Sequence, residues 1–310
     1  MLTRINGTDI FFDIEGSALR KIDGQMCEVP TILALHGGLG FDHGYLRDGL
    51  GRLQDIAQII YVDLRGQGRS GRPALETATL EQMADDVAEL IRMLGPHKPY
   101  IFGHSAGGFV ALHLALRHSR SIAGLILSGT APTVAPIQDE PNQPTPTLAD
   151  RAPPKTMEVA ARIFSGDITA ESVAEFFEKV GPYYAAPAQM GLTATLLQAT
   201  SKNVDMMKHF MTKIAPQYDL TSQLHLIAVP TLVLVGAYDW VCPPRASRAI
   251  AKSIAQSKFV LFDRSGHFLF SEEPEKFRGV VVDFLADHAD DPWSLSMSDG
   301  ANTGRSANTS

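Results

Sequence analysis

Short runs of consecutive apolar residues alternate along this chain with longer segments in which apolar residues recur every three or four positions. The runs have the length of strands, and the longer segments have the period of helices with one buried face. Strands that are apolar throughout are typical of parallel sheets covered by helices on both faces, so we predict an α/β fold of this kind. The predicted strands span 31–35, 59–62, 100–102, 122–127, 230–236 and 259–262, and the predicted helices span 79–94, 106–118 and a segment beginning near Pro274.

Local signals mark the ends of several elements. Residues 2–5 and 8–14 are strand-like, and the Asn6-Gly7 pair between them is typical of a two-residue hairpin turn. Thr79 has the position of a helix N-cap, and Gly95 follows the last turn of the same helix. The chain therefore begins with an antiparallel hairpin and continues into the alternating pattern.

The alternation stops near residue 131 and resumes near residue 226. Seven prolines between 132 and 154 exclude a regular helix or a central strand there. Four amphipathic segments follow, at 155–164, 170–180, 188–199 and 204–214. We predict a core formed by 1–131 and 226–290, a helical cap over 132–225 with a Pro-rich linker over 132–154, and a disordered tail over 291–310.

Composition and charge argue against several classes of function. The chain has 310 residues, a formal charge of −7 and no basic stripe, which argues against nucleic-acid binding. Its two cysteines, Cys27 and Cys242, lie too far apart to indicate a disulfide framework, and neither belongs to a metal motif. The N-terminus lacks an apolar signal core, and no apolar run is long enough to cross a membrane. We expect a cytoplasmic protein that acts on a small molecule without a metal or cofactor.

A serine lies at a tight turn between a predicted strand and a predicted helix. Gly103 and Gly107 flank Ser105 with the G-x-S-x-G spacing of a nucleophile elbow. A serine on so sharp a bend has strained backbone, and side chains two residues away on either side would collide unless they were very small. The alternative is an ordinary glycine-rich turn with a solvated serine, so the partners of the serine must decide.

Two candidate partners follow later strands. A serine hydroxyl needs a base, and the base needs an acid to orient it. Asp239 follows the strand over 230–236, and His267 follows the strand over 259–262. Asp219 precedes the resumed sheet, and Asp263 is too near His267 along one loop, so Asp239 is the favoured acid. Seven other histidines are interpreted as surface or packing residues, namely His43, His97, His113, His118, His209, His225 and His288.

Two backbone N–H groups would stabilise the oxyanion. One is that of Ala106, next to the serine, and the other lies in the turn His36-Gly37-Gly38-Leu39-Gly40, with Gly38 favoured and Gly37 as the alternative. We expect His36 to brace this loop. We also expect Asp63 and Arg65 to form a local ion pair within their own turn.

The chain resembles the α/β-hydrolase superfamily, and within it the proline iminopeptidase-type branch. The resemblance rests on five segments, which are HGGLG, DLRGQGRS, GHSAGG, GAYDWVCPP and SGHF. The resemblance implies the α/β-hydrolase fold with an inserted helical cap. It also implies that Ser105 attacks a carbonyl, that His267 acts as base and Asp239 orients it, and that no cofactor takes part. Leu39 replaces the proline usual in the branch, and the elbow has the common esterase-like form.

Substrate selection would lie in the cap and in the loops that carry the acid and the base. The candidate lining residues are Tyr183, Tyr184, Met207, Phe210, Met211, Trp240 and Phe268. Iminopeptidases of this type hold the amino terminus of the substrate with cap carboxylates. Glu171, Glu175 and Glu178 are available here, but their spacing favours a solvated helix face.

The leading hypothesis is a serine hydrolase that cleaves a small, largely apolar carboxylic ester, lactone or amide through an acyl-enzyme on Ser105. A proline iminopeptidase is the main alternative. A C–C bond hydrolase would use the same residues, and a non-catalytic ligand-binding protein can retain them on the same fold. A cofactor-free perhydrolase or dioxygenase is a further alternative.

Overall fold

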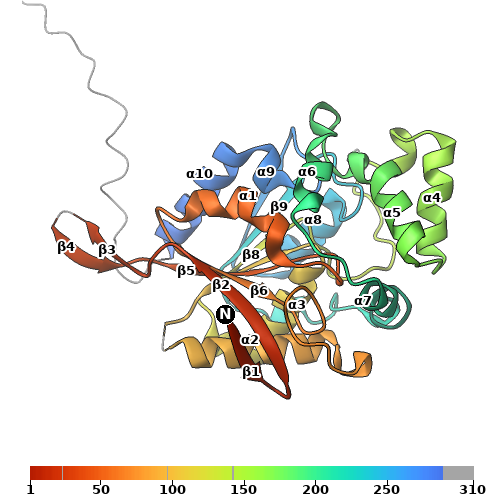
Figure 1. Ribbon diagram of the computed structural model, residues 1–310. Coiled ribbons are helices and arrows are strands. Elements are labelled where there is room, and N and C mark those ends of the chain that lie inside the picture. The colour runs from red at the N-terminus through yellow and green to blue at the C-terminus, as the bar shows by residue number, and fades with distance from the viewer. Residues whose placement is uncertain (23, 96, 142, 289–310) are drawn as a thin grey trace, which may run out of the picture.

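The central sheet of the protein has eight strands in the order β1-β2-β6-β5-β7-β8-β9-β10 (Figure 1). A computed structural model describes residues 1–22, 24–95, 97–141 and 143–288, so the tail predicted over 291–310 lies outside the described residues. Strand β2 is antiparallel to both of its neighbours, and the strands from β6 to β10 pair in parallel. The strands are β1 (Leu2–Ile5), β2 (Thr8–Glu15), β5 (Thr31–Leu35), β6 (Gln58–Asp63), β7 (Tyr100–His104), β8 (Gly124–Ser128), β9 (Thr231–Gly236) and β10 (Ser257–Phe262). The prediction of a mostly parallel sheet is confirmed.

The N-terminal hairpin turns at the predicted residues. Asn6 and Gly7 have φ angles of 45° and 81°, which are the left-handed values that a type I′ turn requires. A second hairpin, β3 (Leu19–Ile22) with β4 (Gln25–Glu28), follows and forms a separate two-stranded sheet. The sequence analysis missed it because residues 19–28 are mostly polar and lack alternation with a buried face.

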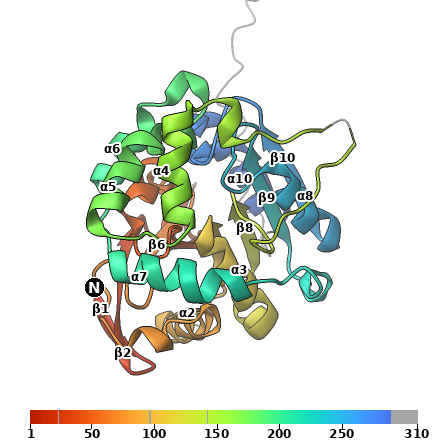
Figure 2. The same ribbon diagram turned by 90° about the vertical axis from the view of Figure 1, so that its right-hand side faces the viewer.

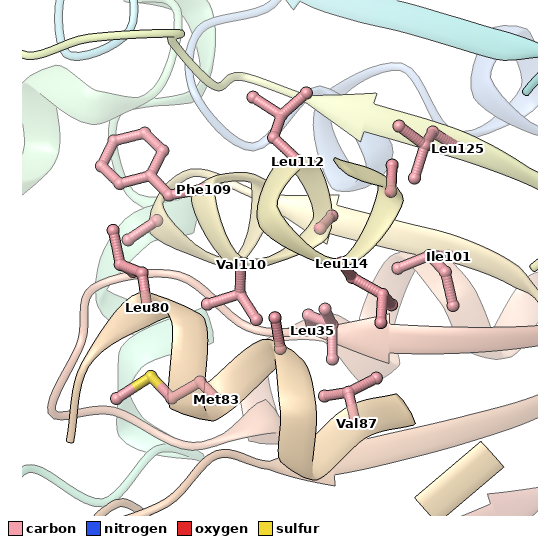
Figure 3. Close-up of a cluster of buried hydrophobic side chains, with 14 of the residues drawn as sticks. Leu35, Leu80, Met83, Val87, Ile101, Phe109, Val110, Leu112, Leu114 and Leu125 are labelled. Atoms are coloured by element: carbon pink, nitrogen blue, oxygen red, sulfur yellow. The ribbon is translucent and has the colours of Figure 1, made fainter. Parts of the chain in front are cut away.

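Alternate residues of each strand pack on opposite faces of the sheet, as the pleat requires. Leu33 and Leu35 of β5 face a cluster completed by α2 (Leu80–Leu94), α3 (Ala106–His118) and α8 (Pro244–Ser253). Ile32 and Ala34 face the other cluster, completed by α1 (Arg47–Leu50), α9 (Leu269–Glu272) and α10 (Pro274–Asp287). Figure 3 shows the first cluster, with side chains of α3 gathered between those of α2 and the strands. Both faces are therefore covered.

The segment between β8 and β9 supplies four helices that group on one side of the molecule (Figures 1 and 2). They are α4 (Pro154–Phe164), α5 (Ala170–Lys179), α6 (Leu192–Gln198) and α7 (Val204–His209). Helix α7 continues as a turn of π-helix over Phe210–Ile214, and α6 is shorter than predicted because a 3₁₀ turn over Pro187–Gln189 precedes it. None of the helices in the described part of the chain has the length and apolar character needed to cross a membrane.

Arg65 forms a buried ion pair, but its partner is Asp86 of α2 and not Asp63. Its Nε and Nη2 atoms donate to the two carboxylate oxygens of Asp86 at 2.7 Å each, and both side chains are 3% exposed. Asp63 instead accepts from His43, with Nδ1 at 2.6 Å from Oδ1. The expected local pair was wrong because α2 brings a second carboxylate to the guanidinium from 21 residues away.

We expect Asp86→Ala to lower the free energy of unfolding by about 3–5 kcal/mol, because it leaves the Arg65 guanidinium buried without a counter-charge. Urea unfolding followed by circular dichroism would measure this loss. The matched control is Asp85→Ala, which removes a carboxylate one position away that is 31% exposed and pairs with the partly exposed Arg117. This control should lose about 1 kcal/mol or less, and equal losses in the two variants would contradict the prediction.

Candidate active site

Ser105 is the single residue between the end of β7 and the start of α3. Its φ and ψ angles are 53° and −125°, a sparsely populated conformation that costs an L-residue about 1–3 kcal/mol. The flanking glycines are required by contact. A Cβ on Gly103 would lie 2.8 Å from the Gly108 Cα, and one on Gly107 would lie 2.2 Å from the carbonyl oxygen of Leu35. The turn therefore closes only because both positions lack a side chain.

The backbone of Ser105 is fixed by the neighbouring strand. Its N–H donates to the carbonyl of Ser128 at 3.0 Å, and its own carbonyl accepts from the Thr130 hydroxyl at 2.8 Å. Its side chain meets the thiol of Cys242. Burial raises the pKa of this thiol well above its usual value, the charge of Asp239 raises it further, and the hydrogen bond with Ser105 only partly opposes them. Cys242 is therefore a neutral thiol at physiological pH.

His267 and Asp239 are joined by a buried hydrogen bond. The Nδ1 atom of His267 lies 2.8 Å from Oδ2 of Asp239, and the side chains are 3% and 0% exposed. The other oxygen of Asp239 accepts from the backbone N–H groups of Val241 and Cys242 at 2.9 Å each. This arrangement assigns the proton of the neutral ring to Nδ1. Nε2 has no hydrogen-bond partner among the described residues, and it is the nitrogen available to a serine hydroxyl.

Ser105 and His267 line the same cavity, but no hydrogen bond joins their side chains among the described contacts. Cys242 lines the cavity together with them. A hydrogen bond between hydroxyl and imidazole in an unliganded site often forms only when the substrate binds.

Glu272 organises the loop that carries His267. Its buried carboxylate accepts the backbone N–H groups of Gly266, Phe268 and Ala186 at distances between 2.7 and 3.0 Å. Burial raises the pKa of this carboxyl group, although the three N–H groups favour the charged form. The first two donors flank His267, and Ala186 belongs to the inserted segment. Glu272 therefore holds the histidine loop against that segment.

Two backbone amides beside Ser105 have no acceptor among the described residues. They are those of Gly38 and Ala106, the amides predicted for the oxyanion. The Gly37 amide, the alternative, donates to the Tyr45 hydroxyl at 2.7 Å and is occupied. Gly38 has φ 61°, and a Cβ there would lie 2.1 Å from the ring of Phe41, so this position also requires glycine.

Tyr45 and His104 link the oxyanion loop to the histidine loop, and the sequence analysis assigned neither of them a role. The Tyr45 hydroxyl accepts from Gly37, so it donates to Nδ1 of His104 at 2.7 Å. The remaining ring proton of His104 is then on Nε2, which donates to the carbonyl of His267 at 3.0 Å. Burial lowers the pKa of His104 well below its usual value, so the ring is neutral and the chain of donors has one direction.

We expect Tyr45→Phe to lower kcat by about 10-fold to 100-fold and the free energy of unfolding by about 1–3 kcal/mol, because it leaves a buried N–H and a buried ring nitrogen unpaired. Ester hydrolysis and urea unfolding would measure the two effects. Tyr183→Phe is the control, since the Tyr183 hydroxyl has no partner among the described residues and lies outside the cavity. A Tyr45→Phe variant with the kcat of the parent would contradict the role of this link.

Ser105 opens into a cavity of about 660 Å³ between the carboxyl ends of the strands and the inserted helices. Six of the seven residues predicted to bind substrate line it, namely Tyr184, Met207, Phe210, Met211, Trp240 and Phe268. Other apolar lining residues were not anticipated, chiefly Phe41 after β5 and Val173, Phe176 and Phe177 of α5. The apolar periodicity of α5 indicated that Val173, Phe176 and Phe177 share a buried face. Periodicity does not distinguish a face that lines a cavity from one that packs in a core.

Tyr183 does not line the cavity. It packs against residues of α4 and α5, and its backbone carbonyl accepts from Nε1 of Trp240 at 2.9 Å. Tyr183 and Tyr184 are neighbours in a 3₁₀ turn, so their side chains point in different directions, and that of Tyr184 reaches the cavity.

The three carboxylates of α5 also lie away from the cavity. Glu171 is exposed in the first turn of α5, Glu175 pairs with Arg162 at 2.7 Å, and Glu178 pairs with Lys179 at 2.6 Å. The cavity wall contains no Asp or Glu among the described residues. Nor do these residues include a group of three or more His, Cys, Asp or Glu side chains able to hold a metal ion.

Comparison with known proteins agrees with this geometry. The model of the alpha/beta hydrolase fold family matches residues 30–274, which include the elbow and both of its candidate partners. The chain belongs to the α/β-hydrolase fold family. It is an enzyme of the α/β-hydrolase type, and the resemblance to the proline iminopeptidase branch is confirmed.

Three relatives of this α/β hydrolase illustrate the range of the family. The proline iminopeptidase PfmaB of Pestalotiopsis fici is 29% identical over 90% of this chain and 98% of its own. A putative carbamate hydrolase, RutD of Agrobacterium fabrum, is 27% identical over 83% of this chain and 94% of its own. A thermophilic esterase from Thermogutta terrifontis has a TM-score of 0.70 and 26% identity over 93% of this chain and all of its own. Similar proteins are thus named as a peptidase, a putative carbamate hydrolase and an esterase.

Proposed function

We propose that this α/β hydrolase is a serine hydrolase that cleaves a small, largely apolar carboxylic ester, lactone or amide through an acyl-enzyme on Ser105. One observation carries the proposal. Ser105 and His267 both open into one apolar cavity, and the Nδ1 atom of His267 is bound to the buried carboxylate of Asp239. A base oriented in this way can accept the proton of the serine hydroxyl.

In the proposed reaction the Ser105 oxygen attacks the carbonyl carbon while Nε2 of His267 takes the hydroxyl proton. The amides of Gly38 and Ala106 donate to the oxyanion, and Asp239 stabilises the imidazolium that forms. The bond to the leaving group then breaks, and His267 gives its proton to the leaving oxygen or nitrogen. A water molecule, deprotonated by His267, attacks the acyl-enzyme and releases the acid and free Ser105.

The lining of the cavity favours neutral or anionic substrates over cationic ones. Aromatic, aliphatic and Met side chains supply most of the wall, and no described lining residue is acidic. A substrate with a free amino terminus is a cation near neutral pH, and burying that charge without a carboxylate partner is costly. An ester or lactone carries no such charge, so this cavity favours esters and lactones.

Release of an N-terminal proline is the second candidate, and it is favoured by the similarity to proline iminopeptidases at 26–29% identity. Glu171, Glu175 and Glu178, which were considered for holding the substrate amine, point elsewhere. Sequence similarity therefore supports this candidate function, but the described cavity wall has no carboxylate to bind the substrate amine.

A substrate panel tests the proposal. It contains aryl esters, γ-lactones, an aryl carbamate and proline β-naphthylamide, each assayed with the parent protein and with Ser105→Ala. We expect hydrolysis of esters or lactones that disappears in the variant. Cleavage of the naphthylamide with no ester hydrolysis would favour the iminopeptidase instead, and no Ser105-dependent turnover of any substrate would reject both.

A further inference from the structure

Arg245 supplies the only Lys or Arg side chain among the described residues of the cavity wall. It lies in the first turn of α8, three residues after Cys242, whose thiol meets Ser105. Its side chain is 26% exposed, so it is partly desolvated without being closed off from the cavity. A cation in this position is unusual in a wall that is largely apolar, and the steps attributed to Ser105, His267 and Asp239 do not use it.

The guanidinium of Arg245 is only partly occupied. Nη1 donates to Oδ1 of Asp139 at 3.0 Å and also to the hydroxyl of Thr145. Nε and Nη2 donate to no residue in the described part of the chain. These two nitrogens form one edge of the planar group, and such an edge binds a carboxylate through two parallel hydrogen bonds. Asp139 and Thr145 therefore fix the side chain and leave this edge available.

A different part of the cavity wall is wholly apolar. Phe41 forms one cluster there with apolar residues of the segment that runs from α4 to the π-helical turn after α7. The members that also line the cavity are Phe41, Ile163, Ile168, Val173, Phe177, Leu197, Met207 and Met211. The cavity thus offers an apolar surface in one region and an arginine edge in another. A substrate with an apolar group and an anionic group would satisfy both.

We propose that Arg245 is a specificity-determining residue that binds a free carboxylate of the substrate, distinct from the ester or lactone carbonyl that is cleaved. This inference rests on the proposed hydrolase function and narrows its substrate class to apolar esters or lactones that also carry a free carboxylate. The carboxylate lies on the part of the substrate that faces residues 134–137 and the start of α8. Binding there adds affinity for the anionic substrate and takes no part in bond cleavage.

Arg245 also attaches the proline-rich segment to α8 through Asp139, and Lys252 of α8 makes a parallel link to Glu140 at 2.6 Å. If this attachment were the whole role of Arg245, removing Asp139 would have the same effect as removing Arg245. Asp139→Asn is therefore the matched control. It weakens the attachment but leaves the Nε–Nη2 edge in place.

The test compares p-nitrophenyl hexanoate with two carboxylate-bearing analogues, the mono-p-nitrophenyl ester of adipic acid and 4-hexanoyloxybenzoate. The first analogue carries the carboxylate on the acyl part, and the second carries it on the leaving group. We expect Arg245→Met to raise KM at least tenfold for one of the two analogues and less than twofold for the hexanoate, with kcat little changed. Arg245→Lys should retain part of the preference, and Asp139→Asn should retain all of it.

Equal changes in KM for the neutral ester and both carboxylate esters in Arg245→Met would overturn the inference while leaving the proposed hydrolase intact. So would a loss of preference in Asp139→Asn that matches the loss in Arg245→Met. If the protein hydrolyses none of these esters, binding of adipate and of the neutral hexanamide is measured from the fluorescence of Trp240 after Trp293→Phe, since these are the two tryptophans of the chain. Tighter binding of adipate that Arg245→Met abolishes would support the carboxylate site on its own, and equal binding would reject it.

Discussion

Replacing Ser105 by alanine is expected to lower kcat for the best ester or lactone substrate by at least about 10⁴-fold, because it removes the group proposed to form the acyl-enzyme. The fold should be unaffected. An alanine at position 105 keeps the Cβ atom and can keep the backbone conformation with φ 53°. The backbone hydrogen bonds of Ser105 to Ser128 and Thr130 do not involve the Ser105 hydroxyl. The free energy of unfolding should therefore change by less than about 0.5 kcal/mol.

Two experiments test this prediction, namely steady-state measurement of kcat and labelling of the protein with a fluorophosphonate probe. The parent should be labelled on Ser105, and the alanine variant should not be labelled at all. Ser253→Ala is the control, because that hydroxyl donates within α8 and does not line the cavity. Retention of more than about one-hundredth of the parent kcat in Ser105→Ala, or labelling of the variant at another residue with turnover intact, would contradict the assigned nucleophile.

Gly107→Ala is expected to cost about 3 kcal/mol or more of the free energy of unfolding and to abolish hydrolysis. The added Cβ would lie 2.2 Å from the carbonyl oxygen of Leu35 and 2.6 Å from that of His36. Both atoms are backbone at the end of β5, so they cannot rotate away as a flexible side chain can. The overlap would separate α3 from β5 and displace the turn that carries the Gly38 amide.

The measurements are urea unfolding and the ester assay, and the control is a second helical glycine. Gly279 lies on the exposed side of α10, and a Cβ there would meet no atom within 4 Å. Gly279→Ala should therefore raise the free energy of unfolding by about 0.5–1 kcal/mol, because alanine has the higher helix propensity. A Gly107→Ala variant as stable as the parent would show that the turn can relax, which would contradict the steric account of the elbow.

Local signals were sufficient where the cause of the structure is local. The hairpin at Asn6-Gly7, the Thr79 N-cap and the elbow between β7 and α3 all appear at the predicted residues, because each depends on φ angles or on hydrogen bonds within a few positions. Apolar periodicity also predicted the parallel sheet, because a strand that is apolar throughout needs cover on both faces. The β3–β4 hairpin carries neither kind of signal and was missed.

The candidate site was predictable in part for the same reason. Asp239 and His267 each follow a strand of a parallel sheet, and the carboxyl ends of such strands meet at one edge. The sequence therefore indicated that the two side chains meet, and the structure joins them through Nδ1 and Oδ2 at 2.8 Å. Sequence spacing gave no sign that the Ser105 hydroxyl meets Cys242.

What the sequence alone determined is the set of positions where the backbone needs glycine, a cap or an apolar strand, and the order in which a serine, an acid and a histidine follow strands of one sheet. The tertiary structure alone decided which distant groups pair. It joined Arg65 to Asp86, occupied the Gly37 amide with Tyr45, turned Tyr183 out of the cavity and placed Arg245 in its wall. The physical reason is that a turn or a helix depends on neighbours along the chain, whereas a buried hydrogen bond or a cavity wall depends on which elements pack together.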